Sequence, residues 1–372
     1  MVKYNWSIYD IEARMSRLYI LLQKETDPKK RLLIEADLRN LKKYFDDQYY
    51  HEVYNQKKLL TRYENRKNEC SQIEFLKDDF GEFADLTTGF PTAPEISNVS
   101  LSKDDILELT HDFYKTLNHY FFRRFKKNFA QRYDHIAFIE NSKEKFKGVA
   151  LSILSLKETF IDIHRDYTLT DVITVIHEYM HATSMVINPY HFLDNKYIYS
   201  ELDTAFIELL AADYLNGIFK GNTGPALKAS NHAERINDVR NVIDTFKIIG
   251  FEERLGCDFD DNSELKNAAQ KTCNLSGKML EDMLTIGDFQ PEIYITGYIF
   301  AIELYDLYKR DKDLALFFLR SIIEMRCYTY EDYYRQLKKF NLYPNNHMSE
   351  YHQELQSDVI RLERLRKEKS EM

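Results

Sequence analysis

The stretch that decides the fold is TLTDVITVIHEYMHATSMVI, residues 168–187. Thr168 is followed three positions later by Asp171, which is the pattern of a capping box at the N-terminus of a helix. Asn188 precedes Pro189, and a residue before proline is disfavoured in the helical conformation. The sequence therefore predicts one largely apolar helix of about five turns between these two signals.

Two histidines and a glutamate lie inside this predicted helix. His177 and His181 are four positions apart, so their side chains share one face and can bind a single metal ion from the same side. Glu178 is rotated by about 100° from His177, which suits a general base acting on water better than a third ligand. Polar groups buried among apolar side chains cost several kcal/mol unless they are paired or metal-bound. The pattern predicts a zinc site, and the alternative is that these groups satisfy one another or face water.

A catalytic zinc site has three protein ligands and one open position, so a further ligand must come from another element. The stretch SELDTAFIELLAADYLNGIF, residues 200–219, predicts a second helix with Glu208 in its middle, among apolar residues. Glu208 follows His181 by 27 positions (208 − 181), which is enough for a loop and an antiparallel return. Glu208 is therefore the predicted third ligand, and the alternative is a buried salt bridge or a partly exposed helix face. Three other acidic residues are candidates for hydrogen bonds to the histidines: Glu201, Asp203 and Asp213.

These two segments resemble a known family. The sequence HEYMHA at residues 177–182, followed by DTAFIELLAADYL at residues 203–215, is similar to the thimet oligopeptidase and oligopeptidase F family of zinc peptidases. The stretch 137–182, which leads into the histidine helix, resembles that family as well, and the resemblance covers about residues 135–310. It implies a mostly helical fold around a deep channel, peptide substrates, and a third zinc ligand from a glutamate at the position of Glu208.

The resemblance also implies tyrosines that face the zinc from a late segment and polarise the scissile carbonyl. The matching stretch is GDFQPEIYITGYIFAIELY, residues 287–305. Tyr294 and Tyr298 are four positions apart, so they share a helix face, and a phenol can donate a hydrogen bond to a developing oxyanion. Both are predicted catalytic donors. Because the chain has 27 tyrosines, simple packing is the alternative role for this pair.

The segment before the histidine helix has a different pattern. The stretches HIAFIE, residues 135–140, and ETFIDIH, residues 158–164, are short, β-branched and aromatic, which is typical of strands. The sequence therefore predicts a small sheet within about residues 135–165. The resemblance implies that its last strand, about residues 158–163, is an exposed edge to which a peptide adds by main-chain hydrogen bonds.

The composition limits the class of protein. Of the 372 residues, 44% are hydrophobic and 30% are charged, which is typical of a globular protein with material for a core. The formal net charge of −9 argues against nucleic-acid binding, because phosphate neutralisation dominates that affinity. The four cysteines lie far apart without a CxxC pair, so neither a disulfide framework nor a thiolate zinc site is expected. We see no signal peptide and no membrane span, and a cytoplasmic location is the expectation.

The long helical stretches divide the chain into two predicted parts. With 11 glycines and 7 prolines, the sequence has few helix breakers. Residues 6–24 and the stretch that begins at Asp27-Pro28 predict a helical hairpin, and residues 102–131 predict one helix. We expect an N-terminal helical arm over residues 1–90, with a supporting role, and a catalytic domain over residues 91–372.

The predicted fold is mainly α, a zincin-type helical bowl or channel with a small sheet beside the histidine helix (about 169–187) and the glutamate helix (about 201–218). The predicted function is hydrolysis of peptide bonds in oligopeptides, with one zinc ion. The alternatives within enzymes are a related zinc carboxypeptidase and a protease with one dedicated protein target. The alternative from another class is a helical scaffold without activity.

Overall fold

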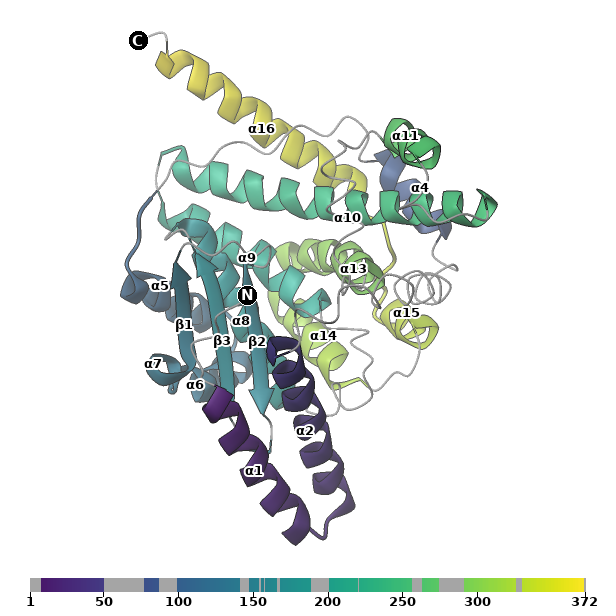
Figure 1. Ribbon diagram of the computed structural model, residues 1–372. Coiled ribbons are helices and arrows are strands. Elements are labelled where there is room, and N and C mark those ends of the chain that lie inside the picture. Colours follow the sequence, from purple (N-terminus) through teal and green to yellow (C-terminus); the bar gives the residue numbers. More distant parts are fainter. Residues whose placement is uncertain are drawn as a thin grey trace.

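The computed structural model describes the following residues: 8–49, 77–86, 99–140, 147–153, 155–156, 158–165, 168–188, 201–219, 221–255, 263–273, 291–325 and 330–370. Helices dominate these residues, and the strands form one small sheet (Figure 1). The predicted fold class, mainly α with a small sheet beside the histidine helix, is confirmed. Among the described helices, none combines the length and the apolar character that crossing a bilayer requires.

The elements follow one another along the chain in a simple order, with helices on both sides of the sheet segment. The helices and strands are α1 (Ile8–Lys24), α2 (Pro28–Tyr49), α4 (Lys77–Leu86), α5 (Lys103–Thr116), α6 (His119–Phe129), α7 (Arg132–His135), β1 (Ile136–Glu140), β2 (Gly148–Ile153), β3 (Glu158–Arg165), α8 (Leu169–Ile187), α9 (Leu202–Ile218), α10 (Thr223–Leu255), α11 (Ser263–Cys273), α13 (Pro291–Arg310), α14 (Lys312–Glu324), α15 (Tyr330–Lys339) and α16 (Met348–Ser370).

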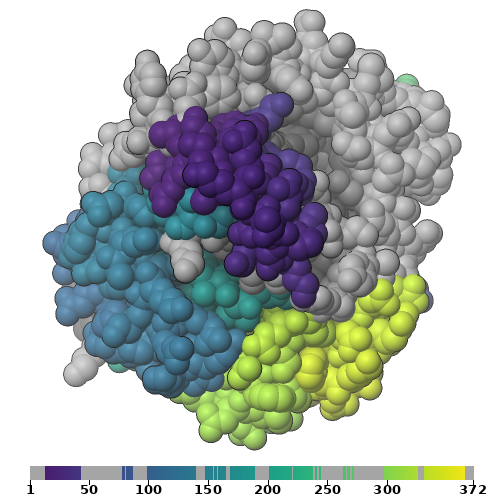
Figure 2. All heavy atoms as spheres, turned by 90° about the horizontal axis from the view of Figure 1, so that it is seen from below, coloured from purple at the N-terminus to yellow at the C-terminus, as the bar shows by residue number. Residues whose placement is uncertain are grey.

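The first two helices form a hairpin that packs on the sheet with a small core of its own. Apolar side chains of α1 and α2 meet Ile153 and Phe160 of the strands, separately from the main core. Asp37 of α2 accepts a hydrogen bond from the N–H of Ser155 at 2.7 Å, which ties the hairpin to the turn between β2 and β3. Figure 2 shows the hairpin, in purple, as one lobe of the face seen from below. Helix α4 instead joins the main core through Phe83, and the predicted division near residue 90 stays a prediction.

Residues 102–131, predicted as one helix, form the two helices α5 and α6. The chain turns at Leu117 and Asn118, and Asn118 has extended backbone angles (φ −108°, ψ 170°). Its side chain accepts a hydrogen bond from the N–H of Phe121, which satisfies one of the free donors at a helix N-terminus. The prediction of one helix was wrong because the apolar residues keep helical spacing through the whole stretch, which hides the break. The first helix ends before Leu117, and Asn118 caps the start of the second helix.

The sheet has the strand order β1-β3-β2, with β1 parallel and β2 antiparallel to β3. The prediction that the strand at about residues 158–163 is an exposed edge is therefore wrong, because β3 is hydrogen-bonded on both sides. The reason is that the preceding stretch, residues 148–153, is itself a strand and folds back on β3, with Ala150 opposite Ile161. The edge that lies against helix α8 is β2.

Helix α8 lies in the middle of the main core. Thr168 and Asp171 form the predicted capping box, in which the N–H of Thr168 donates to Asp171 at 2.8 Å. At the other end, the side-chain amide of Asn188 donates to the carbonyl of Ile323 on α14 at 3.0 Å. Helices α5, α6 and α9 and strand β2 pack on α8, while α10 and α13 pack on α9. Most side chains in the middle of α8 are therefore buried, while those of His177 and His181 stay partly exposed.

Candidate metal centre

Helix α8 carries both predicted histidine ligands. His177 and His181 lie one turn apart, and their Nε2 atoms are 3.0 Å from each other. The rings are almost perpendicular, with an interplanar angle of 80°, so the two Nε2 atoms converge while the ring bodies do not stack. Both side chains are mostly buried, with an acidic residue of α9 and the acidic residue directly before α9 beside them. The structure thus brings the two imidazole nitrogens to one point, as the spacing of four predicts.

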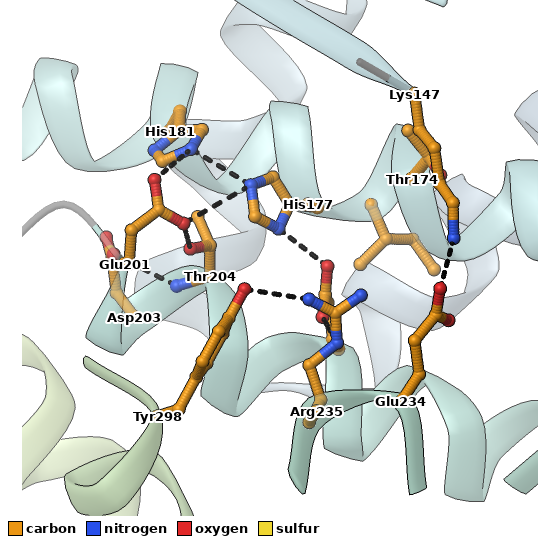
Figure 3. A network of polar contacts seen from close by, with 12 residues as sticks. Lys147, Thr174, His177, His181, Glu201, Asp203, Thr204, Glu234, Arg235 and Tyr298 are labelled. Atoms are coloured by element: carbon orange, nitrogen blue, oxygen red, sulfur yellow. Dashed lines mark hydrogen bonds and ion pairs between the residues drawn. The ribbon is translucent and has the colours of Figure 1, made fainter. Parts of the chain in front are cut away.

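The carboxylate that meets both nitrogens is Glu201, which immediately precedes α9. One of its oxygens lies 3.7 Å from Nε2 of His177 and the other lies 3.7 Å from Nε2 of His181 (Figure 3). The Thr204 hydroxyl donates to the same carboxylate at 3.1 Å and holds it in place. Among the described residues, these three are the group of histidine and acidic side chains whose donor atoms all lie within 4.8 Å of one another.

The spacing of these donors fits a tetrahedral zinc ion. Two atoms that each lie about 2.0–2.1 Å from a tetrahedral zinc are about 3.3 Å apart. The observed separations are 3.0 Å between the two imidazole nitrogens and 3.7 Å between each nitrogen and the nearer Glu201 oxygen. Two imidazoles and one carboxylate also form one of the usual donor sets of catalytic zinc. The site can therefore accept a zinc ion with shifts of a few tenths of an ångström.

Glu208, the predicted third ligand, lies on the opposite side of His177. Its Oε1 is 2.8 Å from Nδ1 of His177, and the structure places it outside the group formed by His177, His181 and Glu201. The physical reason is its place on α9. Glu208 is seven positions after Glu201 (208 − 201), so it shares that face of the helix but lies two turns, or about 10 Å, further along the axis. Glu201, and not the predicted Glu208, therefore lies beside the Nε2 atoms of both histidines.

The contact with Glu208 fixes the tautomer of His177. Burial alone raises the pKa of Glu208, but the charges of Arg235 and His177 outweigh it and hold that pKa below its ordinary value. An ionised carboxylate can only accept, so Nδ1 of His177 carries the hydrogen of this bond. Nε2 is then the nitrogen whose lone pair a metal would use. A carboxylate on the outer nitrogen of a metal-binding histidine is a common arrangement.

The charges around the two rings set which of them carries a proton. Burial lowers the pKa of His177, but the charges of Glu208, Glu178 and Glu201 outweigh it and raise that pKa to about 9. Burial and the charge of His177 hold the pKa of His181 well below its ordinary value. His177 is therefore the protonated ring and can donate from Nε2 to Nε2 of His181. Burial also raises the pKa of Glu201 to about 7.

Glu178, the predicted general base, is buried on the β2 side of α8. Burial raises its pKa to about 7, against the charge of His177 and the hydrogen bond from the N–H of Ala150 on the edge strand. Gly148 lies so close that a Cβ on it would be 2.8 Å from Oε1 of Glu178. The close contact with β2 therefore depends on a residue without a side chain, and it fixes where the carboxylate of Glu178 can lie.

The predicted tyrosine pair lies on α13. Tyr298 is almost fully buried, and its hydroxyl accepts a hydrogen bond from Nη1 of Arg235 at 2.7 Å (Figure 3). Nε of the same arginine lies 2.9 Å from Oε2 of Glu208. Tyr294 belongs to the same helix, but its side chain lies outside the described part of the structure. The predicted role of Tyr294 stays a prediction.

Sequence reasoning did not find the part that Arg235 has in this site. Arg235 belongs to a long helix with mixed polar and apolar residues, and nothing in its neighbours marks it as different from Lys228 or Arg240. The sequence did indicate Glu201 as an acidic residue near the histidines, but it did not show whether Glu201 or Glu208 is the third ligand. Both Glu201 and Glu208 follow His181 at distances that a returning helix can span, so spacing alone cannot separate them. The side-chain geometry was needed to do so.

Comparison with known proteins finds similarity in structure and not in sequence. The sequence matches no protein-family model, and no curated protein is similar to it in sequence. A structure assigned to oligoendopeptidase F from Bacillus anthracis str. Ames has a TM-score of 0.54 and 12% identity, over 96% of this chain and 67% of that one. A structure assigned as a peptidase from Chlamydophila abortus has a TM-score of 0.53 and 13% identity, over 94% and 63%.

A further structure assigned to oligoendopeptidase F gives a TM-score of 0.52 and 13% identity, over 91% of this chain and 65% of that one. At such identities the similarity is one of fold. The chain spans about two thirds of the length of these structures. It therefore has the mostly helical fold found in structures assigned to oligoendopeptidase F, and its two convergent histidines lie in the middle of that fold.

Proposed function

We propose that this chain is a zinc-dependent peptidase that cleaves oligopeptides. The observation that carries the proposal is the convergence of the His177 and His181 nitrogens with the Glu201 carboxylate, next to a buried Glu178. His177, His181 and Glu201 would hold the ion, and Glu208 would orient His177. When bound, zinc supplies a Lewis acid that acts on water and on the scissile carbonyl. The shared fold with oligoendopeptidase F structures supports a peptide as the substrate.

Glu178 is the group that moves the proton. Its carboxylate takes a proton from the attacking water and passes it to the nitrogen of the leaving amine. A pKa of about 7, raised by burial, suits both steps, because the group can take up and release a proton near neutral pH. The N–H of Ala150 holds the carboxylate on the side of α8 that faces the edge strand.

Tyr298 is the candidate donor to the oxyanion that forms on the scissile carbonyl. Its hydroxyl oxygen already accepts a hydrogen bond from Arg235, and a hydroxyl that accepts can also donate its own proton. The positive charge of Arg235 makes this phenol a stronger donor. Tyr294 stays a second candidate from the same helix.

The edge strand β2 is the proposed place for the substrate main chain. The N–H of Ala150 points away from β3 toward Glu178, so alternate residues of β2 direct their backbone polar groups to the side on which β2 has no strand partner among the described residues. A peptide that adds there is held by main-chain hydrogen bonds, which tolerate many side chains. The substrate would then lie beside Glu178. This replaces the strand at residues 158–163 as the candidate edge.

The proposal is tested with the variant Glu178→Gln and with Glu331→Gln, an exposed glutamate of α15, as the matched control. The purified proteins are analysed for zinc by mass spectrometry and are given a library of quenched fluorescent peptides. We expect the wild type and the control to hold one zinc ion per chain and to cleave peptides. Glu178→Gln should hold zinc and cleave about 10²–10⁴-fold more slowly, since it loses general acid–base catalysis.

Product lengths distinguish the remaining alternatives. Internal cleavage supports the oligopeptidase, whereas release of single C-terminal residues identifies a carboxypeptidase. Cleavage of one folded protein but of no library peptide identifies a dedicated protease. Zinc binding without any cleavage by the wild type would contradict the proposal and identify a scaffold.

A further inference from the structure

Arg235 contacts two groups of the site at once. From α10, its Nε lies 2.9 Å from Oε2 of Glu208 on α9, while its Nη1 donates to the Tyr298 hydroxyl on α13 at 2.7 Å. Its guanidinium carbon is 5.3 Å from the centre of the Tyr298 ring. The side chains of Arg235 and Glu208 are 14% and 6% exposed, so water screens this contact weakly. One planar cation therefore connects three helices (Figure 3).

This connection continues to the histidine. The other oxygen of Glu208, Oε1, accepts the hydrogen of Nδ1 of His177, so Arg235 and His177 hold the two ends of one carboxylate. If Arg235 were absent, Oε2 of Glu208 would lose the cation beside it, and the carboxylate could rotate away from His177. His177 would then lose the partner that fixes its tautomer and directs Nε2 toward His181.

We infer that Arg235 is a positioning residue, which sets the orientation of His177 through Glu208 and the place of the Tyr298 hydroxyl directly. The inference rests on the proposed function and deepens it. Two nitrogens of a rigid fork are needed, because Glu208 and Tyr298 lie on different helices. A lysine offers a single point of charge and can satisfy one of the two groups but not both.

A matched control exists on the same helix. Lys228 precedes Arg235 by seven positions (235 − 228), which is two turns on the same face of α10, and its Nζ lies 2.8 Å from Asp213 of α9. This ion pair also joins α10 to α9. In the described part of the chain, the Asp213 carboxylate contacts Lys228 and Tyr305 and neither His177 nor His181, so Lys228→Met removes an ion pair between the same two helices without touching the site.

The test compares Arg235→Met, Arg235→Lys and Lys228→Met. The zinc dissociation constant is measured by competition with a chelator, and kcat and KM are measured on zinc-saturated protein. We expect Arg235→Met to bind zinc about 10- to 100-fold more weakly, as for other groups that orient a metal ligand. Arg235→Lys should recover much of the zinc affinity but keep a lowered kcat with little change in KM. Lys228→Met should match the wild type in all three quantities.

Arg235→Met removes the cation beside the buried Glu208 carboxylate, so this single variant can fold poorly. A double variant provides a test in that case. In Arg235→Met/Glu208→Gln no charge is left unpaired, and its zinc affinity should equal that of Glu208→Gln alone. A further loss in the double variant, or an Arg235→Met protein that behaves like Lys228→Met, would overturn the inference alone. A wild type that binds no zinc would overturn the proposed function and the inference with it.

Discussion

Two groups of polar side chains lie on the same three helices, between one and two turns apart, and they differ in what they can do. The site triplet consists of Glu208 on α9, Arg235 on α10 and Tyr298 on α13. The packing triplet takes an acid, a base and a tyrosine from the same three helices, in the same order: Asp213, Lys228 and Tyr305. The separations along α10 and α13 are both seven positions (235 − 228 and 305 − 298).

The difference lies in the partners of the acid. In the packing triplet, Asp213 takes the Lys228 cation on one oxygen and the Tyr305 hydroxyl on the other. In the site triplet, one oxygen of Glu208 faces Arg235 and the other faces His177, whose second nitrogen meets His181 and Glu201. Polar burial alone therefore does not identify a site. What identifies a site is a set of lone pairs that are directed at a common point.

The largest effect is expected at the carboxylate that faces the two Nε2 atoms. Glu201→Gln should weaken zinc binding more than Glu208→Gln, because a neutral amide replaces a ligand in the first case and only the partner of a ligand in the second. For Glu208→Gln the loss should be about 10- to 100-fold. Both variants have the same shape as the wild type, so competition with a chelator measures the chemistry. If Glu208→Gln lost more zinc affinity than Glu201→Gln, the assignment of Glu208 from sequence would be restored.

A second large effect is expected where β2 approaches the base. In Gly148→Ala the new Cβ would lie 2.8 Å from Oε1 and 2.9 Å from Cγ of Glu178, so that side chain must move. A displacement of about 1 Å at a catalytic group can lower the rate about 10²-fold. We therefore expect kcat to fall by about that factor while the zinc affinity is kept. Gly217→Ala in α9 is the control, because nothing lies within 4 Å of its added Cβ. Equal kcat values in the two variants would contradict the role of the close contact.

The sequence predicted what depends on neighbouring residues. The capping box of Thr168 and Asp171 involves positions three apart, and the face shared by His177 and His181 involves positions four apart, so helical geometry alone determines both. The apolar character of the two central helices placed them inside the fold for the same reason. The mainly helical class followed from the scarcity of helix breakers.

The rest depends on distant parts of the chain. Residues 148–153 fold back onto β3, and this pairing makes β2 the edge strand. The sequence pattern of residues 158–164 would be the same for an edge strand and for a central strand, so it could not predict this. Which glutamate meets the histidines depends on how far α9 slides along α8, and a slide of two turns exchanges Glu201 and Glu208. Arg235 enters the site from a third helix, so no local pattern could indicate it.

A smaller effect is expected from the buried histidine beside the packing triplet. Burial lowers the pKa of His232 to about 3, and the Tyr351 hydroxyl lies 2.7 Å from its Nδ1. At pH values between about 3 and 6.5, His232 binds a proton in the unfolded chain but not in the folded chain. The free energy of unfolding therefore falls as the pH falls through this range. From pH 7 to pH 5 the loss from this group should be about 2 kcal/mol.

The variant His232→Gln should lack that part of the pH dependence. Urea unfolding at pH 7 and pH 5 measures it, with zinc-free protein so that metal binding does not enter. The wild type should lose about 2 kcal/mol more between the two pH values than the variant. Equal losses would mean that His232 is protonated in the folded state at pH 5, and its buried imidazole would then be a cation.

The smallest effect is expected for the tyrosine of the packing triplet, and it gives the sharpest contrast with the tyrosine of the site. Tyr305→Phe removes the hydroxyl that donates to Asp213 at 2.5 Å, but Lys228 still holds the other oxygen, so the free energy of unfolding should fall by only about 1 kcal/mol. Zinc affinity and kcat should not change. Tyr298→Phe, two turns earlier on α13, should lower kcat instead. If Tyr305→Phe weakened zinc binding, the two triplets would be coupled through α9 and α10, and the site would extend over both.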